Sequence, residues 1–552
     1  MGLMSRLAGR RYRLNPASSR RVQVEKDLRV PMRDGVMLLA DRWHAPGAGR
    51  SPVVLIRSCY GRGALFGTTA RLFAERGFQV ILQSTRGIDG SGGEFQPFRQ
   101  ERADGLDTLS WVRSQPWFGG RLYTFGLSYL GYTQWAMAEQ AGRGIQAMAL
   151  HVTLSNFRNE TLASGGFTLD GSLSWARMMS GMVAGAPLWK QALKLRFPIR
   201  PAILNHLPLK ELDRLAIGRE VSWWQDWLRH GDPDDPWWSE VDHSGRAAQV
   251  TAPAVLVGGW RDIFLPSQIK DFEAMQRAGR KAWLTVGPWD HTAQEGMAES
   301  MRQGLELFSA DAAGTTPFAG RDRVRLYVGG ADQWRDYPAW PPPGSREQRL
   351  YLRAGNRLSG QPAQGACAPS SYVYDPSDPT PAVHGPRLSN TRKVQDMAAL
   401  AGRPDTVCFT SAPLGEDAEA IGPVGVELQV RTSAASADFY ACLCEVDRKG
   451  RALHVVDGYR RIRARDAPVD ARGSRTVTLE CWPTAHRFRR GHRLQLIVAS
   501  GAHPRYARNP GTDEPLGSAT AMVSSRQQIL HDATSRSALV LTVREPVRFE
   551  QE

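Results

Sequence analysis

The sequence predicts an α/β domain that is interrupted by a helical insertion and followed by an all-β domain. Apolar, β-prone runs alternate with helical stretches over the first third of the chain, and two more such runs appear after a tryptophan-rich helical block. Later β-like runs follow one another without helical patterns between them. Buried parallel strands give continuous apolar runs joined by helices, whereas strands without intervening helices favour packed antiparallel sheets. We expect the α/β domain at 22–155 and 244–320, a helical cap at 156–243 and a jelly-roll β-sandwich at 321–552.

The elements of the α/β domain can be placed in order along the chain. Expected strands are the apolar runs at 36–43, 52–60, 78–87, 122–128 and 145–155, and expected helices lie at 68–77, 101–115 and 132–144. The following block is helical and rich in tryptophan, and strands resume at 252–262 and 281–291. Because the strand pattern resumes after it, the helical block is predicted to be a lid inserted into the sheet domain.

The sequence pattern of the C-terminal part is typical of a β-sandwich. Its β-like runs are joined by connections rich in proline and glycine, such as "PAWPPPG". This pattern favours a sandwich or jelly roll of two antiparallel sheets. The expected strands lie at 323–330, 348–354, 424–434, 437–447, 475–482 and 493–500.

Composition narrows the class of protein. The chain has 552 residues, 42% of them apolar and 23% charged, which is typical of a globular protein with more than one domain. It contains no long apolar run, and the N-terminal arginines are not followed by an apolar segment, so neither a membrane span nor a secretory signal is expected. The six cysteines are sparse and match neither a disulfide scaffold nor a zinc site. We therefore expect a cytoplasmic protein that does not act at a membrane.

The net charge of +15 raises the question of a nucleic-acid partner. Most of the excess is arginine, since only 8 of the 70 basic residues are lysine, and it is spread along the chain. The main local cluster, "HRFRRGHR" from His486, is expected to be a solvated edge of the jelly roll. A basic enzyme explains this distribution more simply than a nucleic-acid-binding protein does, so we expect no nucleic-acid partner.

A single serine stands at a predicted joint between a strand and a helix. In "YTFGLSYLG", Ser128 lies between Gly126 and Gly131, and a helical stretch follows at once. Such a turn would direct the hydroxyl outward as a nucleophile, although a serine after glycine more often marks an ordinary turn. The general G-x-S-x-G elbow has glycine two positions after the serine, whereas this chain has Leu130 there.

A serine nucleophile needs a base and a group that orients the base. In α/β-hydrolases the chain order is serine, acid and then histidine, each near a strand end. Asp262 ends one predicted strand and His291 follows the next, which makes them the leading candidates. Other residues near strand ends remain open as alternatives, because an aspartate after a strand often caps a helix and most histidines are structural. They are His44, His151 and Asp290.

The motifs resemble those of the CocE/NonD family of serine hydrolases, which is related to X-Pro dipeptidyl peptidases and α-amino-acid ester hydrolases. The matching pieces appear in family order and include "VPMRDGVMLLADRW", "PVVLIRSCYGRG", "QSTRGIDGSGGEF", "SQPWFGGRLYTFGLSYLG", "GGWRDIF", "GPWDH" and "FTSAPLGEDAEAIGPVGVEL". The resemblance covers nearly the whole chain after about residue 22. It implies an α/β-hydrolase domain with an inserted cap and a C-terminal jelly roll.

The resemblance also assigns roles to particular residues. It implies a catalytic triad of Ser128, Asp262 and His291, and an oxyanion hole formed by the backbone N–H of Tyr129 and the phenol of Tyr60. Two positions depart from the usual pattern. Cys59 stands where the family often has proline before the oxyanion tyrosine, and Ser84 stands where it often has aspartate.

The glycine-rich stretch "RGIDGSGG" is not expected to hold a phosphate. It lacks the Lys-Ser/Thr of a P-loop and the G-x-G-x-x-G register. The resemblance makes it a structural loop, with Arg86 and Asp89 as salt-bridge partners. No cofactor and no metal are expected.

Three functions compete at this stage. The leading one is hydrolysis of a small-molecule carboxylic ester through an acyl-enzyme. A peptidase of the X-Pro dipeptidyl type or an α-amino-acid ester hydrolase would need carboxylates near the acyl site, where this chain has Phe264 and Leu265, although Asp170 or Asp213 from the cap could substitute. A non-catalytic carbohydrate-binding protein would need no triad. The sequence leaves the oligomeric state open, including a homo-oligomer.

Overall fold

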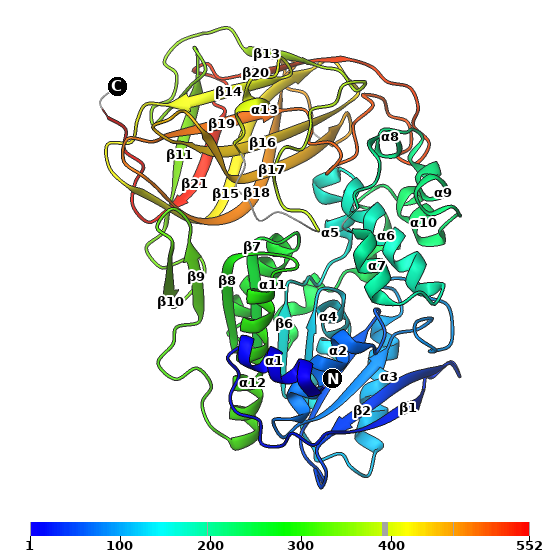
Figure 1. Ribbon diagram of the computed structural model, residues 1–552. Helices are drawn as coiled ribbons and strands as arrows, with labels where there is room; N and C mark the ends of the chain where they lie inside the picture. Colours follow the sequence, from blue (N-terminus) through cyan, green and yellow to red (C-terminus); the bar gives the residue numbers. More distant parts are fainter. Residues whose placement is uncertain (1, 196, 389–395, 467, 551–552) are drawn as a thin grey trace. The chain divides into compact units, whose positions relative to one another are not determined.

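A computed structural model of the chain describes residues 2–195, 197–388, 396–466 and 468–550 (Figure 1). It divides into two compact units. The first comprises Met1–Phe157, Trp175–Pro198 and Pro236–Val324, and the second comprises Arg158–Ser174, Ile199–Asp235 and Arg325–Glu552. The helical insertion is therefore shared between the two units.

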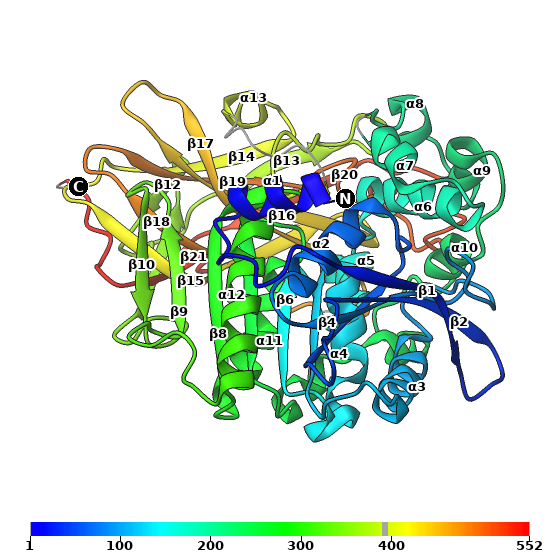
Figure 2. The same cartoon turned by 60° about the horizontal axis from the view of Figure 1, so that its bottom comes forward.

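The first unit is built on a mixed sheet whose strands pair in the order β1-β2-β4-β3-β5-β6-β7-β8. The strands from β3 onward pair in parallel, whereas β2 is antiparallel to both β1 and β4. Figure 2 shows β8, β6, β4 and β2 of this sheet following one another across the view. The central parallel strands are buried along their whole length, as their continuous apolar sequence predicts. The bounds are β1 Gln23–Pro31, β2 Met37–His44, β3 Val53–Ser58, β4 Gln79–Ser84, β5 Leu122–Leu127, β6 Ala147–His151, β7 Ala254–Arg261 and β8 Ala282–Asp290.

Helices cover both faces of this sheet. On one face, Phe73 of α2 packs edge-on against Phe125 of β5, and Phe308 of α12 stacks on Tyr123 of β5 at 4.7 Å between ring centroids. α4, α3 and α11 pack on the other side of the strands. The helices of the unit are α1 Gly2–Arg11, α2 Ala64–Ala74, α3 Glu101–Ser114, α4 Tyr129–Ala141, α11 Leu265–Arg277 and α12 Gln294–Ala313.

Within the described ranges, no helix combines the length and the apolar character that crossing a bilayer requires.

The insertion after β6 consists of short helices. Its α-helices are α5 Arg158–Thr161, α6 Leu169–Val183, α7 Leu188–Leu195, α8 Pro201–Leu204, α9 Leu212–Ile217 and α10 Ser222–Arg229, and 3₁₀ turns lie between and after them up to Gln249. Buried tryptophans hold parts of it together. For example, Trp224 packs edge-on against Phe167 and donates a hydrogen bond to the carbonyl of Leu209 at 3.2 Å.

Apart from its helical segments, the second unit is an almost entirely antiparallel β-sandwich, which confirms the predicted jelly-roll architecture after an α/β-hydrolase domain. The long strand β15 pairs with β18, with β20 near its C-terminal end and with β21, and β21 pairs in turn with β11. β12 and β14 pair in parallel. The strands of the sandwich are β11 Arg346–Arg353, β12 Arg357–Ser359, β13 Ser370–Tyr374, β14 Thr406–Ser411, β15 Ala418–Thr432, β16 Ser436–Val446, β17 Ala452–Arg463, β18 Arg475–Phe488, β19 Arg493–Ala499, β20 Ser525–Leu530 and β21 Ala538–Val543, with a short helix α13 at Ala398–Ala401. The strands β9 Val324–Val328 and β10 Gln333–Tyr337 precede them in the chain and are not part of this sheet.

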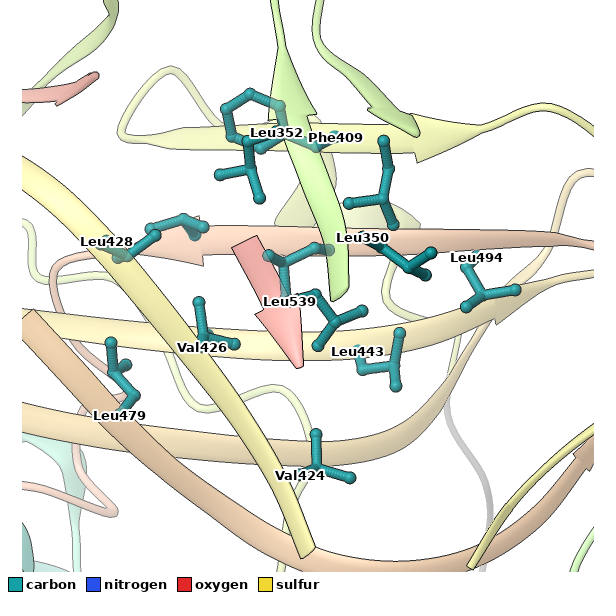
Figure 3. Close-up of a cluster of buried hydrophobic side chains, with 14 of the residues drawn as sticks. Leu350, Leu352, Phe409, Val424, Val426, Leu428, Leu443, Leu479, Leu494 and Leu539 are labelled. Carbon is teal, nitrogen blue, oxygen red and sulfur yellow. The ribbon is translucent and has the colours of Figure 1, made fainter. Parts of the chain in front are cut away.

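The inward-facing side chains of this sandwich form one aliphatic core. They alternate with outward-facing residues along β15, where the buried positions are every second residue from Val424 to Val430. Figure 3 shows leucines and valines from several strands pointing toward one another. The labelled members are Leu350, Leu352, Phe409, Val424, Val426, Leu428, Leu443, Leu479, Leu494 and Leu539.

The basic cluster at 486–493 lies at the end of β18 and in the turn up to the start of β19, where Arg489, Arg490 and Arg493 are exposed. Its first residues belong to β18, which pairs with both β15 and β17. His486 and His492 both contact Glu445, at 2.8 and 2.7 Å, and Arg487 pairs with Glu419. Two buried carboxylates therefore hold three side chains of the cluster against the sheet.

The predicted salt bridge between Arg86 and Asp89 is wrong, because each residue pairs elsewhere. Arg86 pairs with Asp34 at 2.7 Å and with the buried Asp104 at 2.6 Å. Asp89 accepts a hydrogen bond from the backbone N–H of Arg62 at 2.8 Å. Both residues belong to the same glycine-rich loop, but their side chains face different neighbours.

One buried carboxylate in the first unit is held by neutral donors. Asp271 of α11 accepts hydrogen bonds from the N–H and the hydroxyl of Ser155, at 3.1 and 2.5 Å. Burial raises the pKa of Asp271 to about 7, while the hydrogen bonds from Ser155 act in the opposite direction. The contact ties α11 to the segment that follows β6.

Substitution of Asp271 by asparagine should change how stability depends on pH. Between about pH 4 and pH 7 the folded protein holds a proton on Asp271 that the unfolded chain has released. The unfolding free energy of the wild type therefore falls as the pH rises through this range. Relative to wild type, the melting temperature of Asp271→Asn should therefore rise from pH 5 to pH 8, by about 2 °C or more. Thermal melts at several pH values measure this difference.

Asp375 provides a matched control, because it accepts the same pair of hydrogen bonds from Ser377 at an exposed site. Its pKa is lowered, chiefly by the hydrogen bond from the backbone of Ser377. The stability that it contributes is therefore lost only as the pH falls below about 4. Asp375→Asn should differ from wild type by a constant amount between pH 5 and pH 8. A constant difference for Asp271→Asn as well would contradict the prediction.

Candidate active site

Ser128 lies at the joint between β5 and α4, with backbone angles that are rare for a residue with a side chain. Its φ is 54° and its ψ is −125°, and Tyr129 begins the helix immediately afterwards. The side chain is mostly buried, with 8% of the residue exposed. A strained turn at this point of a parallel sheet is the arrangement that places a serine hydroxyl at the carboxyl end of the strands.

The two flanking glycines are required by close contacts. A Cβ on Gly126 would lie 2.4 Å from the carbonyl oxygen of Leu130, and a Cβ on Gly131 would lie 2.4 Å from both Cβ and Oγ1 of Thr153. The second contact explains why glycine is needed at position 131. The glycine that stands one position later than in G-x-S-x-G therefore allows α4 to pack against the segment after β6.

The backbone of Ser128 is fixed by the neighbouring strand. Its N–H donates to the carbonyl of His151 at 2.9 Å, and its own carbonyl accepts a hydrogen bond from the hydroxyl of Thr153 at 2.7 Å. His151 is fully buried, and its Nδ1 bonds the carbonyl of Val257 at 3.0 Å. Burial lowers the pKa of His151 to about 4, so the ring is neutral at physiological pH.

The structure brings Ser128, His291 and Asp262 into one hydrogen-bonded chain. His291 Nε2 lies 3.0 Å from Ser128 Oγ, and His291 Nδ1 lies 2.6 Å from Asp262 Oδ2. Asp262 is fully buried after β7, and its other carboxylate oxygen accepts the N–H of Phe264 at 2.8 Å. Phe264 packs edge-on against the imidazole ring at 5.1 Å. The imidazole is therefore fixed both by a carboxylate and by an aromatic wall.

The three alternative residues have other surroundings. His44 on β2 contacts Glu25 at 3.2 Å. His151 bonds a backbone carbonyl, and Asp290 accepts the N–H and the hydroxyl of Thr292 in the turn after β8. None of these contacts includes the Ser128 hydroxyl.

Tyr60 lies in the loop after β3 and is only partly exposed. Its hydroxyl accepts a hydrogen bond from Trp175 Nε1 at 3.3 Å, and its ring stacks on Phe66 at 6.0 Å. Burial raises the pKa of Tyr60 well above its usual range, and hydrogen bonds with Trp175 and Ser128 act in the opposite direction. The Tyr60 phenol is therefore protonated and lies next to the Ser128 side chain.

Tyr129 is the first residue of α4 and is anchored through its side chain. Its hydroxyl donates to Glu101 at 2.8 Å and accepts the N–H of Phe98 at 2.9 Å. Because the first N–H groups of a helix have no acceptor within the helix, the Tyr129 N–H is free of the helical ladder beside Ser128. The N–H groups of Gly131 and Tyr132 instead bond the Ser128 carbonyl, at 2.9 and 3.1 Å.

Aromatic rings pack around Tyr129, the residue after Ser128. Trp175 of α6 stacks on Tyr129 at 6.2 Å between ring centroids and packs against Phe98 at 5.7 Å. Phe98 stacks on Phe157 at 3.6 Å. Apolar walls with a few fixed polar groups are typical of sites for small organic ligands.

Sequence reasoning missed two contacts of this site. The specific hydrogen bond from Trp175 to Tyr60 joins residues far apart in the sequence, and the cap contains many tryptophans with no pattern that singles one out. The hydrogen bond from Tyr129 to Glu101 was also missed, because it joins two helices that only the tertiary fold brings together. In the part of the chain that the structure describes, no three His, Cys, Asp or Glu side chains are grouped in a way that could hold a metal ion.

Comparisons with known proteins agree with this architecture. Residues 34–293 match the X-Pro dipeptidyl-peptidase (S15) family, and residues 318–540 match the X-Pro dipeptidyl-peptidase C-terminal non-catalytic domain. A cocaine esterase of Rhodococcus sp. (strain MB1 Bresler) is 30% identical over 534 residues, which are 89% of this chain and 92% of the relative.

Two solved structures share the fold. An α-amino acid ester hydrolase superposes with a TM-score of 0.80 at 23% identity and covers 95% of this chain and 96% of its own. A CocE/NonD family hydrolase from Staphylococcus aureus superposes with a TM-score of 0.70 at 18% identity, with coverage of 94% and 93%. Because the identity to the Rhodococcus enzyme extends over most of both chains, this chain belongs to the CocE/NonD family of serine hydrolases.

The contact at Gly131 gives a direct test of the elbow. Gly131→Ala places a methyl group on Thr153, so we expect a loss of about 1–3 kcal/mol in unfolding free energy and a fall in hydrolase activity as α4 shifts. Gly171→Ala, in α6, is the control, because nothing lies within 4 Å of its Cβ position. That variant should be as stable as wild type or slightly more so. Equal effects of the two substitutions on stability and activity would show that the contact with Thr153 is unimportant.

Proposed function

We propose that the protein hydrolyses carboxylic esters of small molecules through an acyl-enzyme on Ser128. The observation that carries this proposal is the hydrogen-bonded order of Ser128, His291 and Asp262, with contacts of 3.0 and 2.6 Å. The name of the Rhodococcus relative, a cocaine esterase, supports an ester as the substrate class.

In the proposed reaction, His291 Nε2 accepts the proton of Ser128 as its oxygen attacks the ester carbonyl carbon. Asp262 holds the Nδ1–H tautomer and stabilises the imidazolium that forms. The tetrahedral intermediate collapses, the C–O bond to the alcohol breaks, and His291 returns the proton to the departing alkoxide oxygen. A water molecule then attacks the acyl-enzyme with His291 again as base, which releases the acid and restores Ser128.

The negative oxygen of the tetrahedral intermediate needs donors that are already in place. The backbone N–H of Tyr129 and the phenol of Tyr60 are the two that we propose. Support comes from the position of Tyr129 at the start of α4 and from the Trp175 hydrogen bond, in which the Tyr60 oxygen is the acceptor, so that its own O–H can donate to another group. The raised pKa of Tyr60 keeps that proton on the phenol.

A serine-directed phosphonate should inactivate the enzyme and add its mass to the peptide that contains Ser128. Ser128→Ala should abolish both labelling and ester hydrolysis, while a chelator should leave the wild-type rate unchanged. Peptide mass spectrometry and a chromogenic ester assay measure these outcomes. Labelling of another residue, or activity that depends on a metal, would refute the proposed nucleophile.

The acyl group that we propose is neutral. An α-amino group entering a dry pocket loses hydration worth several kcal/mol, and only a nearby carboxylate can compensate for it. The residues that follow Asp262 are apolar, since Phe264 packs on His291 and Leu265 is fully buried. Glu101 near Tyr129 already pairs with Arg57 at 2.8 Å.

One of the two cap carboxylates considered from the sequence is engaged within the cap. Asp213 is fully buried and accepts hydrogen bonds from the N–H of Val221 and the side-chain amide of Gln225, at 2.9 and 2.8 Å. It therefore fixes the start of α10. Asp170 lies in the first turn of α6, where the hydroxyl of Ser174 contacts it at 3.4 Å.

The alternative activity is hydrolysis of α-amino-acyl esters or X-Pro peptides. The name of the S15 family match favours it. A non-catalytic carbohydrate-binding protein is no longer a candidate, because the chain belongs to a family of hydrolases. The choice between neutral and α-amino acyl groups can be made by one comparison of substrates.

A phenylacetyl ester should be a better substrate than the phenylglycyl ester of the same leaving group. The two acyl groups differ in the α-amino group, so the ratio of kcat/KM measured above and below the pKa of that amine isolates the effect of its charge. We expect the neutral ester to be favoured by about tenfold or more when the amine is charged. A tenfold preference for the charged phenylglycyl ester would overturn the neutral-acyl proposal and show that a carboxylate reaches the site.

The remaining expectations from the sequence stay proposals. They are the domain bounds at 22–155, 156–243, 244–320 and 321–552, a cytoplasmic location and the absence of nucleic-acid partners. All six cysteines are free thiols, which supports a reducing compartment.

A further inference from the structure

The loop that carries Tyr60 makes a tight turn against Asp89. Gly61 has a φ of 77°, and a Cβ at this position would lie 3.1 Å from a carboxylate oxygen of Asp89. The N–H of Arg62 donates to the same oxygen at 2.8 Å. The backbone on the C-terminal side of Tyr60 is therefore held by one carboxylate.

The side chain of Arg62 is enclosed by acceptors from three other segments. It is 8% exposed, and its Nε donates to the hydroxyl of Ser84 at 3.0 Å. One terminal nitrogen contacts Asp27 at 2.9 Å and Asp41 at 2.5 Å, and the other donates to the carbonyl of Asp89 at 3.1 Å. The guanidinium thus joins the loop after β3 to β1, β2 and the end of β4.

Asp89 is itself fixed in a constrained conformation. Its φ is 48°, in the left-handed region, and its carboxylate also accepts a hydrogen bond from Ser84 at 3.3 Å. Non-glycine residues keep such angles only where the surroundings hold them. Asp89 supplies both a side-chain acceptor and a backbone acceptor to the same arginine.

The other contacts of Tyr60 act on its N–H and its side chain, which also has the hydrogen bond with Ser128. The Tyr60 N–H donates to the hydroxyl of Ser58 at 3.1 Å, and its phenol has the 3.3 Å hydrogen bond from Trp175 and the stacking contact with Phe66. The loop just after β3 must still be held in a fixed position relative to Ser128 for the phenol to reach an oxyanion. The contacts of Arg62 and Asp89 act on the backbone that follows Tyr60.

We propose that Arg62 and Asp89 are positioning residues, which hold the Tyr60 phenol where the oxyanion of the tetrahedral intermediate forms. This inference rests on the proposed role of Tyr60 as an oxyanion donor. Neither residue touches the substrate. They act through the backbone of the Tyr60–Gly61–Arg62 turn, so their loss should weaken binding of the transition state more than binding of the substrate.

A double-mutant cycle with a neutral chromogenic ester tests the proposal. Asp89→Asn removes the charge but keeps the size and tolerates the left-handed backbone. It should lower kcat by about tenfold, and at most about 10²-fold, with little change in KM. Tyr60→Phe should lower kcat by about 10²- to 10³-fold. In the Tyr60→Phe background, Asp89→Asn should cost less than about twofold, because the donor that it positions is already gone.

Asp107 is a matched control for Asp89. It accepts the backbone N–H of Arg33 at 2.8 Å and pairs with the guanidinium of that arginine, which is the same motif on an exposed part of the first unit. Asp107→Asn should leave kcat and KM unchanged. If Asp89→Asn fails to fold by circular dichroism, Arg62→Lys is the second variant, because lysine keeps the charge but cannot reach all the acceptors. Its loss of kcat should likewise disappear in the Tyr60→Phe background.

The outcomes separate this inference from the proposed function. Unchanged kcat in Tyr60→Phe would overturn the oxyanion role of Tyr60 and the positioning proposal with it. A large loss in Tyr60→Phe, together with equal losses for Asp89→Asn in both backgrounds, would overturn only the positioning proposal. A loss confined to KM, or no loss in Asp89→Asn, would also overturn it.

Discussion

The candidate site depends on one constrained residue, Ser128, whose backbone is held at a positive φ between a strand and a helix. Such a conformation costs of order 1–3 kcal/mol and persists only where its surroundings allow no other. Here those surroundings are the two glycine contacts and the hydrogen bonds to His151 and Thr153. Because the parallel strands end at a common edge, the same register that fixes Ser128 also brings the ends of β7 and β8 within reach.

Buried charge behind the site is paired in a way that supports this geometry. Arg57 of β3 and Glu101 of α3 are 1% and 5% exposed and lie 2.8 Å apart. Burial raises the pKa of Glu101, while Arg57 opposes the shift. Glu101 also accepts the hydroxyl of Tyr129, so one ion pair connects β3, α3 and the first residue of α4. Loss of either partner would leave an unpaired buried charge, which is far more costly than loss of a surface ion pair.

The sequence predicted the elements that depend on local pattern. The central strands are continuous apolar runs, and Asp262 and His291 could be singled out because each follows such a run. β1 was not predicted, because most of its residues are exposed and it lacks an apolar pattern. The partners of Arg86 and Asp89 could not be predicted either, since Asp34, Asp104 and Arg62 approach them only through the tertiary fold. The contacts of His486, Arg487 and His492 with Glu445 and Glu419 could not be predicted for a similar reason, because these carboxylates belong to other strands.

The closure of the β-sandwich by β21 has a consequence for biosynthesis. β21 pairs with β11, where Val543 lies opposite Arg346, and with β15, so two strands made much earlier remain without this neighbour until it emerges from the ribosome. Non-local pairings of this kind make folding slow, and strand edges without partners can pair with other chains. Until β21 has been synthesised, β11 and one edge of β15 lack this strand partner. Pairing of these edges with other chains therefore competes with folding of the domain during this interval.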